Sequence, residues 1–346
     1  MKASINFRIS FLLIFIAFNT FSQEKFNLPA KIDSLLKIEH PRKFNGVVLV
    51  SKKRKIIYKK AVGYSNFKDK VPMQEGDNFI IMSNSKQITA VLILLQVQKK
   101  RIDLNHSVKE YLPELNLSWA DSVTIHHLLN FSSGIVDLKE PLIYKPGTDF
   151  NYGNITYILL GKILERVTGK KYIDLAIQLF KSLRLKNTYC LEKNEFQNYV
   201  QGYQNVSNVF HPDYSGIENE DLISAAGIIS NIFDLNRWDR LLHTGKILKP
   251  EIYKLMIDYR INSYHNAFEK EKIGYGYGLR ISDKTKIKYL GHTGSGSGFI
   301  SYKIYFPDNQ IDLIILENQT NENPSLNYEF GIKIKELIMK SILSQN

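Results

Sequence analysis

The feature that most constrains the fold is that strand-like segments lie at both ends of the chain, while the long stretch between them has a helical pattern. Near the N-terminus, NGVVLV (45–50) and IIYKKAV (56–62) flank a lysine-rich turn, as in a β-hairpin. Near the C-terminus, turn signals separate three further runs, KIKYLGHTG, GFISYKIYF and IDLIILEN. Strands of one sheet bury their apolar faces together, so the pattern predicts an α+β fold with an antiparallel five-stranded sheet built from both chain ends.

Apolar residues recur every three or four positions around and between these strands, which is the spacing of amphipathic helices. Such segments precede the first strand (30–40) and follow the last (328–343), and we expect both helices to flank the sheet. The middle of the chain holds five more: ITAVLILLQVQKK, IHHLLNF, ITYILLGKILERVTG, IDLAIQLFKSL and DLNRWDRLLHTG. They predict a mostly helical insertion between the two halves of the sheet.

Residues 23–346 show no repeat, low-complexity tract or flexible linker, so we predict a single module. Its sheet region spans about 23–82 and 270–346, and its helical region spans about 83–269. A cleft where two such regions meet is the default place for a ligand.

The first 22 residues have the pattern of a secretory signal peptide. Lys2 and Arg8 precede an apolar run from Ile9 to Phe18, and a short polar stretch near Ser22 offers a cleavage site. An uncleaved membrane anchor is the alternative, but the run is shorter than the roughly 20 residues that a spanning helix needs. We therefore predict an exported protein, periplasmic or secreted, without a stable membrane span in its mature part.

Cysteine content and charge exclude several classes of function. Cys190 is the only cysteine, so an internal disulfide is ruled out. The formal net charge of +12 suits an anionic cell envelope, but no aromatic and basic surface module indicates a nucleic-acid partner. His126 and His127 are adjacent and cannot face the same way on a helix, and no other spacing suits a metal, so we predict no metal and no cofactor.

Two serines lie close to one lysine in IMSNSKQITA (81–90). Ser83 and Lys86 share a face of a helical turn, whereas Ser85 points elsewhere. A serine hydroxyl needs a neighbouring base to attack a substrate, and an uncharged lysine amine can serve as one. The same S-x-x-K spacing begins at three other serines, Ser22, Ser34 and Ser65. Only Ser83 follows an apolar segment and opens a long helix running into the core, although a helix N-cap is an alternative role for it.

Tyr152 and Asn154 bracket a glycine in PGTDFNYGN (146–154), just before another predicted helix. A tyrosine can act as a general acid or base if nearby cations lower its pKa, and an asparagine amide can hydrogen-bond a substrate amide. The Y-x-N spacing also occurs at Tyr64 and Tyr203, and a half-buried turn aromatic is the alternative role for Tyr152.

The run GHTGSGSGFIS (291–301) places His292, Thr293 and Gly294 on a predicted strand with glycines at alternate positions. Bare backbone of this kind lets a substrate approach and pair along the strand edge. An earlier H-T-G copy begins at His243, where it ends a helix and has a structural explanation. Neither a phosphate-binding loop nor a G-x-S-x-G nucleophile elbow fits the later run.

Taken in this order, S-x-x-K at Ser83, Y-x-N at Tyr152 and H-T-G at His292 resemble the three motifs of the serine β-lactamase and penicillin-binding protein superfamily. The resemblance is to its class C-like branch, which includes class C β-lactamases, D-alanyl-D-alanine carboxypeptidases, D-aminopeptidases and related esterases. It extends through HLLNFSSGI, LLGKILERVTGKKY, AAGIISNIFDLNRW and GHTGSGSGF, and so covers most of the chain after the leader. The family fold it implies is the one that the strand and helix pattern predicts.

The resemblance implies catalytic roles for three residues. Ser83 would be the acylated nucleophile, and its backbone N–H would form half of the oxyanion hole. Lys86 would be the proton partner of Ser83. Tyr152 would protonate the leaving nitrogen or oxygen and later activate water.

It also implies substrate-binding roles. Asn154 would bind the acyl side chain of the substrate. His292, Thr293 and Gly294 would line the strand edge and help to hold a substrate carboxylate. The backbone N–H of Ser295 would complete the oxyanion hole.

Three positions depart from the family pattern. Class C β-lactamases usually have lysine where this chain has His292, and a histidine is mostly neutral at pH 7, which weakens its attraction for a carboxylate. Ala226 stands where a second glycine is frequent, and Asn130-Phe131 replace a common Thr-His pair. The histidine favours a peptidase or esterase over an efficient β-lactamase.

We therefore predict an exported serine hydrolase that works through an acyl-enzyme on D-alanyl peptides or on small amides and esters. A class C-like β-lactamase is the alternative within the same chemistry. A non-hydrolytic sensor of penicillin or peptide is the alternative from another class, although a pure binder has no need for Ser83, Lys86 and Tyr152 together. The expected partners are a small peptide, β-lactam or ester substrate and cell-wall peptidoglycan.

Overall fold

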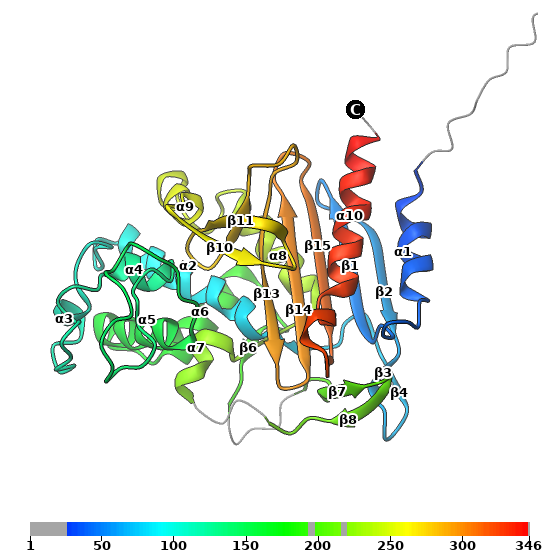
Figure 1. The fold of residues 1–346 in the computed structure, drawn as a ribbon, viewed down its shortest axis with the longest axis horizontal. Coiled ribbons are helices and arrows are strands. Elements are labelled where there is room, and N and C mark those ends of the chain that lie inside the picture. The colour runs from blue at the N-terminus through cyan, green and yellow to red at the C-terminus, as the bar shows by residue number, and fades with distance from the viewer. Residues whose placement is uncertain (1–25, 193–197, 216–219, 345–346) are drawn as a thin grey trace, which may run out of the picture.

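The computed structural model describes residues 26–192, 198–215 and 220–344 (Figure 1). The predicted leader, residues 1–22, lies outside this part of the chain, so its prediction is untested. Within the described ranges, no helix is long and apolar enough to cross a membrane.

One antiparallel sheet of eight strands forms the centre of the fold, with the strand order β10-β11-β12-β13-β14-β15-β1-β2. Five of the strands are the predicted ones: β1 (Gly46–Lys52), β2 (Lys55–Val62), β13 (Tyr289–Gly296), β14 (Phe299–Phe306) and β15 (Ile311–Glu317). The two chain ends pair directly, because β1 lies beside β15 with Val48 opposite Ile315. The predicted α+β fold, with its sheet built from both ends of the chain, is confirmed.

The predicted number of five strands is wrong. Three more strands extend the sheet beyond β13: β10 (Ile261–His265), β11 (Glu269–Tyr275) and β12 (Arg280–Ser282). They lack the apolar runs of the central strands, since β11 reads EKEKIGY and β12 has only three residues. Only β10 of these three lies at the edge of the sheet, but all three segments are short or polar and therefore resemble loops in the sequence.

Both faces of the central sheet are buried, and each face has its own core. Val47 and Leu49 of β1 pack toward the helical region, whereas Val48 and Val50 pack toward the terminal helices. A strand covered on both faces is apolar throughout, which explains the uninterrupted run in β1.

The helices at the two chain ends, α1 (Leu28–Leu36) and α10 (Glu329–Leu343), lie side by side on one face of the sheet, as predicted (Figure 1). The Asn27 side chain begins α1 by accepting a hydrogen bond from the backbone N–H of Ala30 at 3.1 Å. Ile334 of α10 is fully buried in the core between these helices and the sheet.

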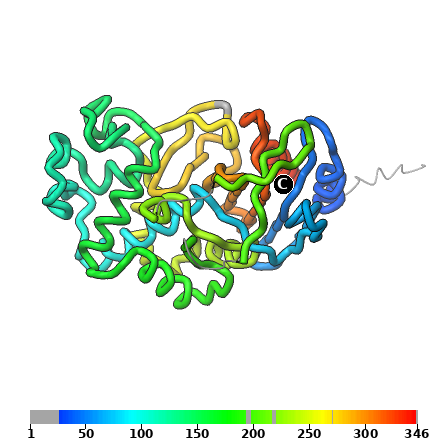
Figure 2. Tube along the Cα trace, turned by 90° about the horizontal axis from the view of Figure 1, so that it is seen from below, coloured from blue at the N-terminus to red at the C-terminus, as the bar shows by residue number. Residues whose placement is uncertain are grey.

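The helical region covers the other face and extends away from the terminal helices (Figure 2). Its helices are α2 (Ser85–Gln98), α3 (Val108–Tyr111), α4 (Ile125–Leu129), α5 (Asn154–Thr168), α6 (Tyr172–Leu183), α7 (Ile223–Ala226), α8 (Ile232–His243) and α9 (Pro250–Ile257). Every residue of α2 from Ser85 to Leu94 is buried, so this helix forms the centre of the region.

Three small sheets and three short 3-10 turns complete the described part of the chain. The small sheets join β3 (Tyr64–Asn66) to β4 (Val71–Pro72), β9 (Ile228–Ser230) to β5 (Phe79–Ile80) and β6 (Tyr189–Cys190), and β7 (Tyr203–Val206) to β8 (Val209–Pro212) and β16 (Gln319–Asn321). The 3-10 turns are η1 (Met82–Asn84), η2 (Glu220–Leu222) and η3 (Pro324–Leu326).

A buried ion pair joins the segment before β1 to the end of β15. Arg42 and Glu317 are each 1% exposed, and the guanidinium contacts both carboxylate oxygens, at 2.5 and 2.9 Å. We expect Arg42→Met to lower the free energy of unfolding by about 3–5 kcal/mol, because Glu317 would remain buried without its partner. Chemical denaturation measures this loss, and the double variant Arg42→Met/Glu317→Gln should recover part of it. A loss in Arg42→Met below about 1 kcal/mol would contradict the expectation.

Candidate active site

Ser83 lies in η1, the tight turn between β5 and α2. Asn84 Nδ2 donates a hydrogen bond to Ser301 Oγ of β14 at 2.7 Å, and that hydroxyl donates to the carbonyl of Ile81 at 2.6 Å. The turn is therefore fastened to the central sheet on both sides of Ser83.

The strand β13 comes very close to this turn at Gly294. A Cβ atom at Gly294 would lie 2.6 Å from the carbonyl oxygen of Ile81 and 2.8 Å from Cβ of Met82. Met82 itself has a φ of 49°, in the left-handed region that most residues avoid. The glycine thus lets the strand approach the turn that carries Ser83, in addition to the substrate approach expected from the sequence.

The two serines on either side of Asn84 have different surroundings. Ser85 is fully buried, and its hydroxyl accepts a hydrogen bond from the backbone N–H of Ile228 at 3.1 Å. Ser83 is partly exposed, and its Oγ lies 3.0 Å from Lys86 Nζ. The structure therefore brings Ser83 and Lys86 together, as their spacing predicts, and gives Ser85 a structural contact.

The Lys86 amine is fully buried and has three partners on three separate elements. Its Nζ lies 3.0 Å from Ser83 Oγ, 2.8 Å from Asn154 Oδ1 at the start of α5 and 3.0 Å from the carbonyl oxygen of Ala225 in α7. No carboxylate pairs with it within the described residues. Burial, with a smaller contribution from the Arg280 cation, lowers the pKa of Lys86 to about 7.

These contacts suit an uncharged amine. A neutral lysine has two N–H bonds, which can be donated to Asn154 and Ala225, and one lone pair that is left to face the Ser83 hydroxyl. Sequence reasoning assigned Asn154 to the substrate and missed Ala225, because a backbone carbonyl carries no sequence signal.

Tyr152 lies just before α5, and its ring packs 4.4 Å from Phe131 between ring centroids. Lys86 Nζ is 5.1 Å from the centre of the Tyr152 ring. Desolvation by the surrounding protein raises the pKa of Tyr152 to about 12, even though the residue is 37% exposed; a hydrogen bond with Ser83 and the Arg280 cation act in the opposite direction. Cations therefore do not lower this pKa below its ordinary value, and the phenol stays protonated near neutral pH, as an acid needs to be.

His292 occupies β13, but its ring is buried, with 1% exposure. Its Nε2 lies 2.9 Å from the hydroxyl of Tyr275, a fully buried residue at the end of β11. Burial first, and then the Arg280 and Lys86 cations, hold the pKa of His292 well below its ordinary value. The ring is therefore neutral and engaged within the protein. It offers no positive charge to a substrate carboxylate, and the sequence already predicts a weak attraction there.

Thr293 and Ser295 are held by residues that sequence reasoning missed. Thr293 Oγ1 lies 3.1 Å from Nε2 of His265 in β10, and Ser295 Oγ accepts a hydrogen bond from Asn327 Nδ2 at 3.2 Å. Ser295 is itself exposed near the end of β13.

Arg280, the first residue of β12, is a buried cation beside this cluster and was also missed from the sequence. It is 4% exposed, and its guanidinium carbon lies 5.7 Å from the centre of the Tyr152 ring and 5.3 Å from that of Tyr275. One nitrogen donates to Ser263 Oγ at 2.8 Å, whereas Nε has no hydrogen-bond partner. Within the described part of the chain no carboxylate pairs with Arg280, so the site holds a buried positive charge without a counter-ion.

The remaining histidine motifs have structural contacts. His243 of the earlier H-T-G copy stacks on Tyr305 at 4.4 Å and lies 2.7 Å from the Tyr253 hydroxyl. His126 Nδ1 contacts the hydroxyl of Tyr277 at 2.6 Å. Among the residues that the structure places, no group of three or more His, Cys, Asp or Glu side chains could hold a metal ion.

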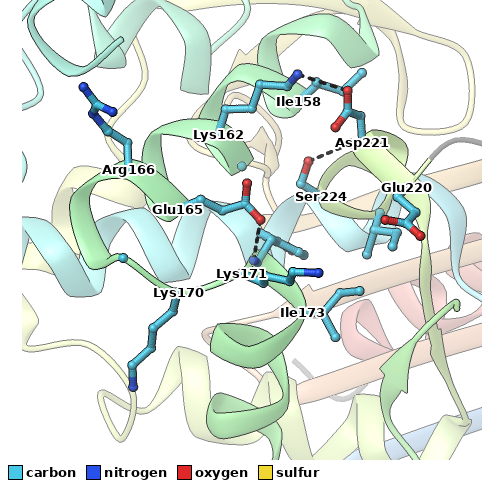
Figure 3. Close-up of a pocket in the computed structure, with 14 residues that line it drawn as sticks. Ile158, Lys162, Glu165, Arg166, Lys170, Lys171, Ile173, Glu220, Asp221 and Ser224 are labelled. Atoms are coloured by element: carbon cyan, nitrogen blue, oxygen red, sulfur yellow. Dashed lines mark hydrogen bonds and ion pairs between the residues drawn. The ribbon is translucent and has the colours of Figure 1, made fainter.

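A cavity of about 650 Å³ lies apart from the site, between α5, the turn into α6 and η2 (Figure 3). Three of its charged side chains bind within its own wall: Lys162 pairs with Asp221 at 3.1 Å, and Glu165 accepts from the backbone N–H of Tyr172 at 2.8 Å. None of the motif residues lines it. The geometry around Ser83 therefore makes the chemical site, and this cavity does not.

Comparison with protein families and curated proteins gives consistent matches. A family model described as Beta-lactamase matches residues 37–333. A penicillin-binding protein of Bacillus subtilis (strain 168) is 25% identical over 322 residues, which cover 81% of this chain and 69% of that protein. Protein flp of Staphylococcus aureus (strain MW2) is 23% identical over 306 residues, which cover 80% of this chain and 59% of that protein. The chain thus spans only part of the length of these relatives.

Solved structures with the same fold include three from different organisms. An octameric penicillin-binding protein homologue from Pyrococcus abyssi has a TM-score of 0.78 at 24% identity, covering 90% of this chain and 77% of that one. D-amino acid amidase from Ochrobactrum anthropi SV3 has a TM-score of 0.78 at 21% identity, covering 91% and 99%. A class C beta lactamase from Rhodobacter sphaeroides has a TM-score of 0.73 at 20% identity, covering 92% and 99%. At these sequence identities the structural similarity establishes the fold alone.

Proposed function

Since this chain belongs to the Beta-lactamase family, we propose that it is a serine hydrolase that is acylated at Ser83 and acts as a carboxypeptidase or esterase on D-alanyl peptides or small amides and esters. The proposal includes export of the mature protein to the periplasm or the cell exterior, on the basis of the leader pattern in residues 1–22.

The observation that carries this proposal is the contact between Lys86 and Ser83. A buried amine with a pKa of about 7, 3.0 Å from a partly exposed serine hydroxyl, is half unprotonated near neutral pH and can take the serine proton. A binding protein gains nothing from an unprotonated lysine in this place.

Acylation then follows from the positions of three groups. Ser83 Oγ attacks the carbonyl carbon of the substrate while its proton passes to the Lys86 amine. The oxyanion that forms is proposed to bind the backbone N–H groups of Ser83 and Ser295. The bond to the leaving nitrogen or oxygen breaks as Tyr152 gives that atom a proton, and transfer of the proton from Lys86 to Tyr152 restores both groups. A water molecule then attacks the acyl-enzyme ester through the same proton transfers, which releases the acid product and restores the Ser83 hydroxyl.

Arg280 supports a substrate that ends in a carboxylate. Its guanidinium lies against the ring of Tyr152, the proposed proton donor, and its Nε has no partner. A buried cation is costly without a counter-ion, and an anionic group of the substrate would supply one. A peptide with a free C-terminal carboxylate meets this requirement, whereas a neutral ester does not.

Intact-mass spectrometry tests the proposal on the mature protein exposed to a fluorescent penicillin and to an activated ester. We expect a mass increase that Ser83→Ala abolishes and that the neighbouring Ser85→Ala, as a matched control, retains. A long-lived adduct supports the peptidase, and rapid release of the opened penicillin supports the class C-like β-lactamase. If neither probe gives an adduct or turnover, the hydrolase proposal is wrong and a non-hydrolytic sensor takes its place.

A further inference from the structure

Gln87 follows the proposed base Lys86 in α2, but its side chain lies against other elements. Its carbonyl oxygen accepts two hydrogen bonds, from Trp238 Nε1 of α8 at 2.9 Å and from Lys303 Nζ of β14 at 2.9 Å. All three side chains are buried, with exposures of 1% for Gln87 and 2% for each of the other two. A single oxygen atom therefore ties the first turn of α2 to a helix and to the central sheet.

The lysine that holds this oxygen is itself fixed. Lys303 Nζ forms a buried ion pair with Asp239 of α8, and Asp239 Oδ1 also lies 3.6 Å from Nε2 of His243. Along the strands, Lys303 is paired directly with His292 of the H-T-G motif. One of the two donors to Gln87 thus lies on β14, the strand that pairs with the H-T-G strand β13.

The backbone of α2 is enclosed at the same point. A Cβ atom at Gly278 would lie 2.9 Å from the carbonyl oxygen of Lys86 and 3.1 Å from Cα of Gln87, so the loop between β11 and β12 packs directly on this turn. This backbone packing and the side-chain hydrogen bonds of Gln87 therefore hold the turn together.

We propose that Gln87 is a positioning residue that sets the rotation of the first turn of α2, so that the Lys86 amine meets Ser83, Asn154 and Ala225 together. The inference rests on the proposed function, because the step it concerns is the acylation of Ser83. Consecutive residues of a helix point about 100° apart. Gln87 therefore contacts α8 and β14 while Lys86 faces Ser83, and a rotation of α2 about its axis would move both side chains away from their partners.

The Lys86 amine can keep all of its contacts only if α2 is placed accurately. The partners of Lys86 belong to η1, α5 and α7, and one movement of α2 changes all three distances. A displacement of about 1 Å at a catalytic group can cost on the order of 100-fold in rate. Loss of the Gln87 hydrogen bonds should therefore slow the chemical step and change the affinity for substrate much less.

Only one of the two polar atoms of the Gln87 side chain takes part. Nε2 has no hydrogen-bond partner, whereas Oε1 accepts from both donors. Glutamate keeps an acceptor oxygen at the position of Oε1, and replacing Nε2 removes no hydrogen bond. Gln87→Glu should therefore preserve the contacts with Trp238 and Lys303. Methionine has a similar length and no oxygen, so Gln87→Met should remove them.

The test is single-turnover acylation of the full mature chain by the fluorescent penicillin or the activated ester. We expect Gln87→Met to lower the acylation rate constant by about 10–100-fold while the apparent dissociation constant of the probe changes by less than about threefold. Gln87→Glu should restore most of the rate. Gln96→Met is the matched control, since Gln96 is buried near the other end of the same helix, and it should acylate at the parent rate. Equal rates for the parent and Gln87→Met, or equal losses in Gln87→Met and Gln87→Glu, would overturn the inference.

A second measurement needs no substrate and separates this inference from the proposed function. NMR of ¹³C-labelled lysine follows the titration of Lys86, assigned with Lys86→Arg. The charged or titratable groups that face this amine are Arg280 of β12, His292 of β13 and the phenols of Tyr152 and Tyr157. We expect Gln87→Met to raise the titration midpoint by about half a unit or more, because a displaced amine is better solvated. If the parent forms no adduct, the hydrolase proposal fails, while an unchanged midpoint in Gln87→Met overturns the positioning role.

Discussion

Replacing Lys86 with methionine is expected to slow the acylation of Ser83 by about 1,000-fold, within the range that general-base catalysis supplies. Methionine keeps the length and the apolar character of the side chain but cannot accept the Ser83 proton. Lys86 is fully buried and has no carboxylate partner among the described residues, so the substitution leaves no buried anion behind. The variant should therefore fold, and rapid-quench measurement of adduct formation gives the rate directly.

The same substitution should change the pH dependence of the reaction. The uncharged amine is the reactive form, so in the parent protein the acylation rate should rise with pH through about 7 and then level off. Below that pH the amine is protonated and cannot act as a base. Tyr152, with a pKa of about 12, does not ionise in this window. In Lys86→Met the limb near pH 7 should be absent.

Lys335→Met is the matched control for this experiment. Lys335 is another buried lysine, 5% exposed, that donates to the carbonyl of Phe268 and lies 3.2 Å from the Tyr289 hydroxyl on the opposite side of the sheet. Its replacement should lower stability and leave both the acylation rate and the pH profile unchanged. A Lys86→Met variant that acylates within tenfold of the parent would show that another group removes the Ser83 proton.

The fold could be predicted where the two faces of the sheet are buried. The central strands β1, β14 and β15 are mostly apolar, because both of their faces are covered, and these runs are visible in the sequence. The three strands beyond β13 could not be predicted in the same way. In β11 the charged residues of EKEKIGY resemble a loop, and only pairing with β10 and β12 makes the segment a strand.

The candidate site also has a part that the sequence predicts and a part that it does not. Ser83 and Lys86 are close in sequence, so the helical spacing alone predicts their contact. Arg280 belongs to no motif, and its position beside Tyr152 arises because β12 pairs with β13, where it lies opposite Gly291. Burial also shifts ionisation equilibria in ways that motif spacing does not reveal, as in the pKa of His292, which it holds well below the ordinary value.

Arg280 leads to the second large effect, a change in substrate preference. For a D-alanyl peptide with a free C-terminal carboxylate, we expect Arg280→Met to lower kcat/KM by about 100-fold, which is the size of a lost hydrogen-bonded charge contact in a buried site. For the same peptide with a C-terminal amide, the change should be less than about threefold, because no anion is involved. Parallel assays of the two peptides give the ratio directly, and the ratio cancels any general loss of folded enzyme.

The fold should tolerate this substitution, because removing a buried cation without a counter-ion relieves a desolvation cost, while the rings of Tyr152 and Tyr275 still pack against the new side chain. Arg280→Lys separates charge from shape: it keeps the positive charge but loses the planar fork, and should retain part of the preference for the carboxylate. Equal losses for both peptides would mean that Arg280 acts by supporting Tyr152. An unchanged preference would mean that the carboxylate binds elsewhere, and Thr293 and Ser295 on β13 would then be its nearest hydroxyl donors to test.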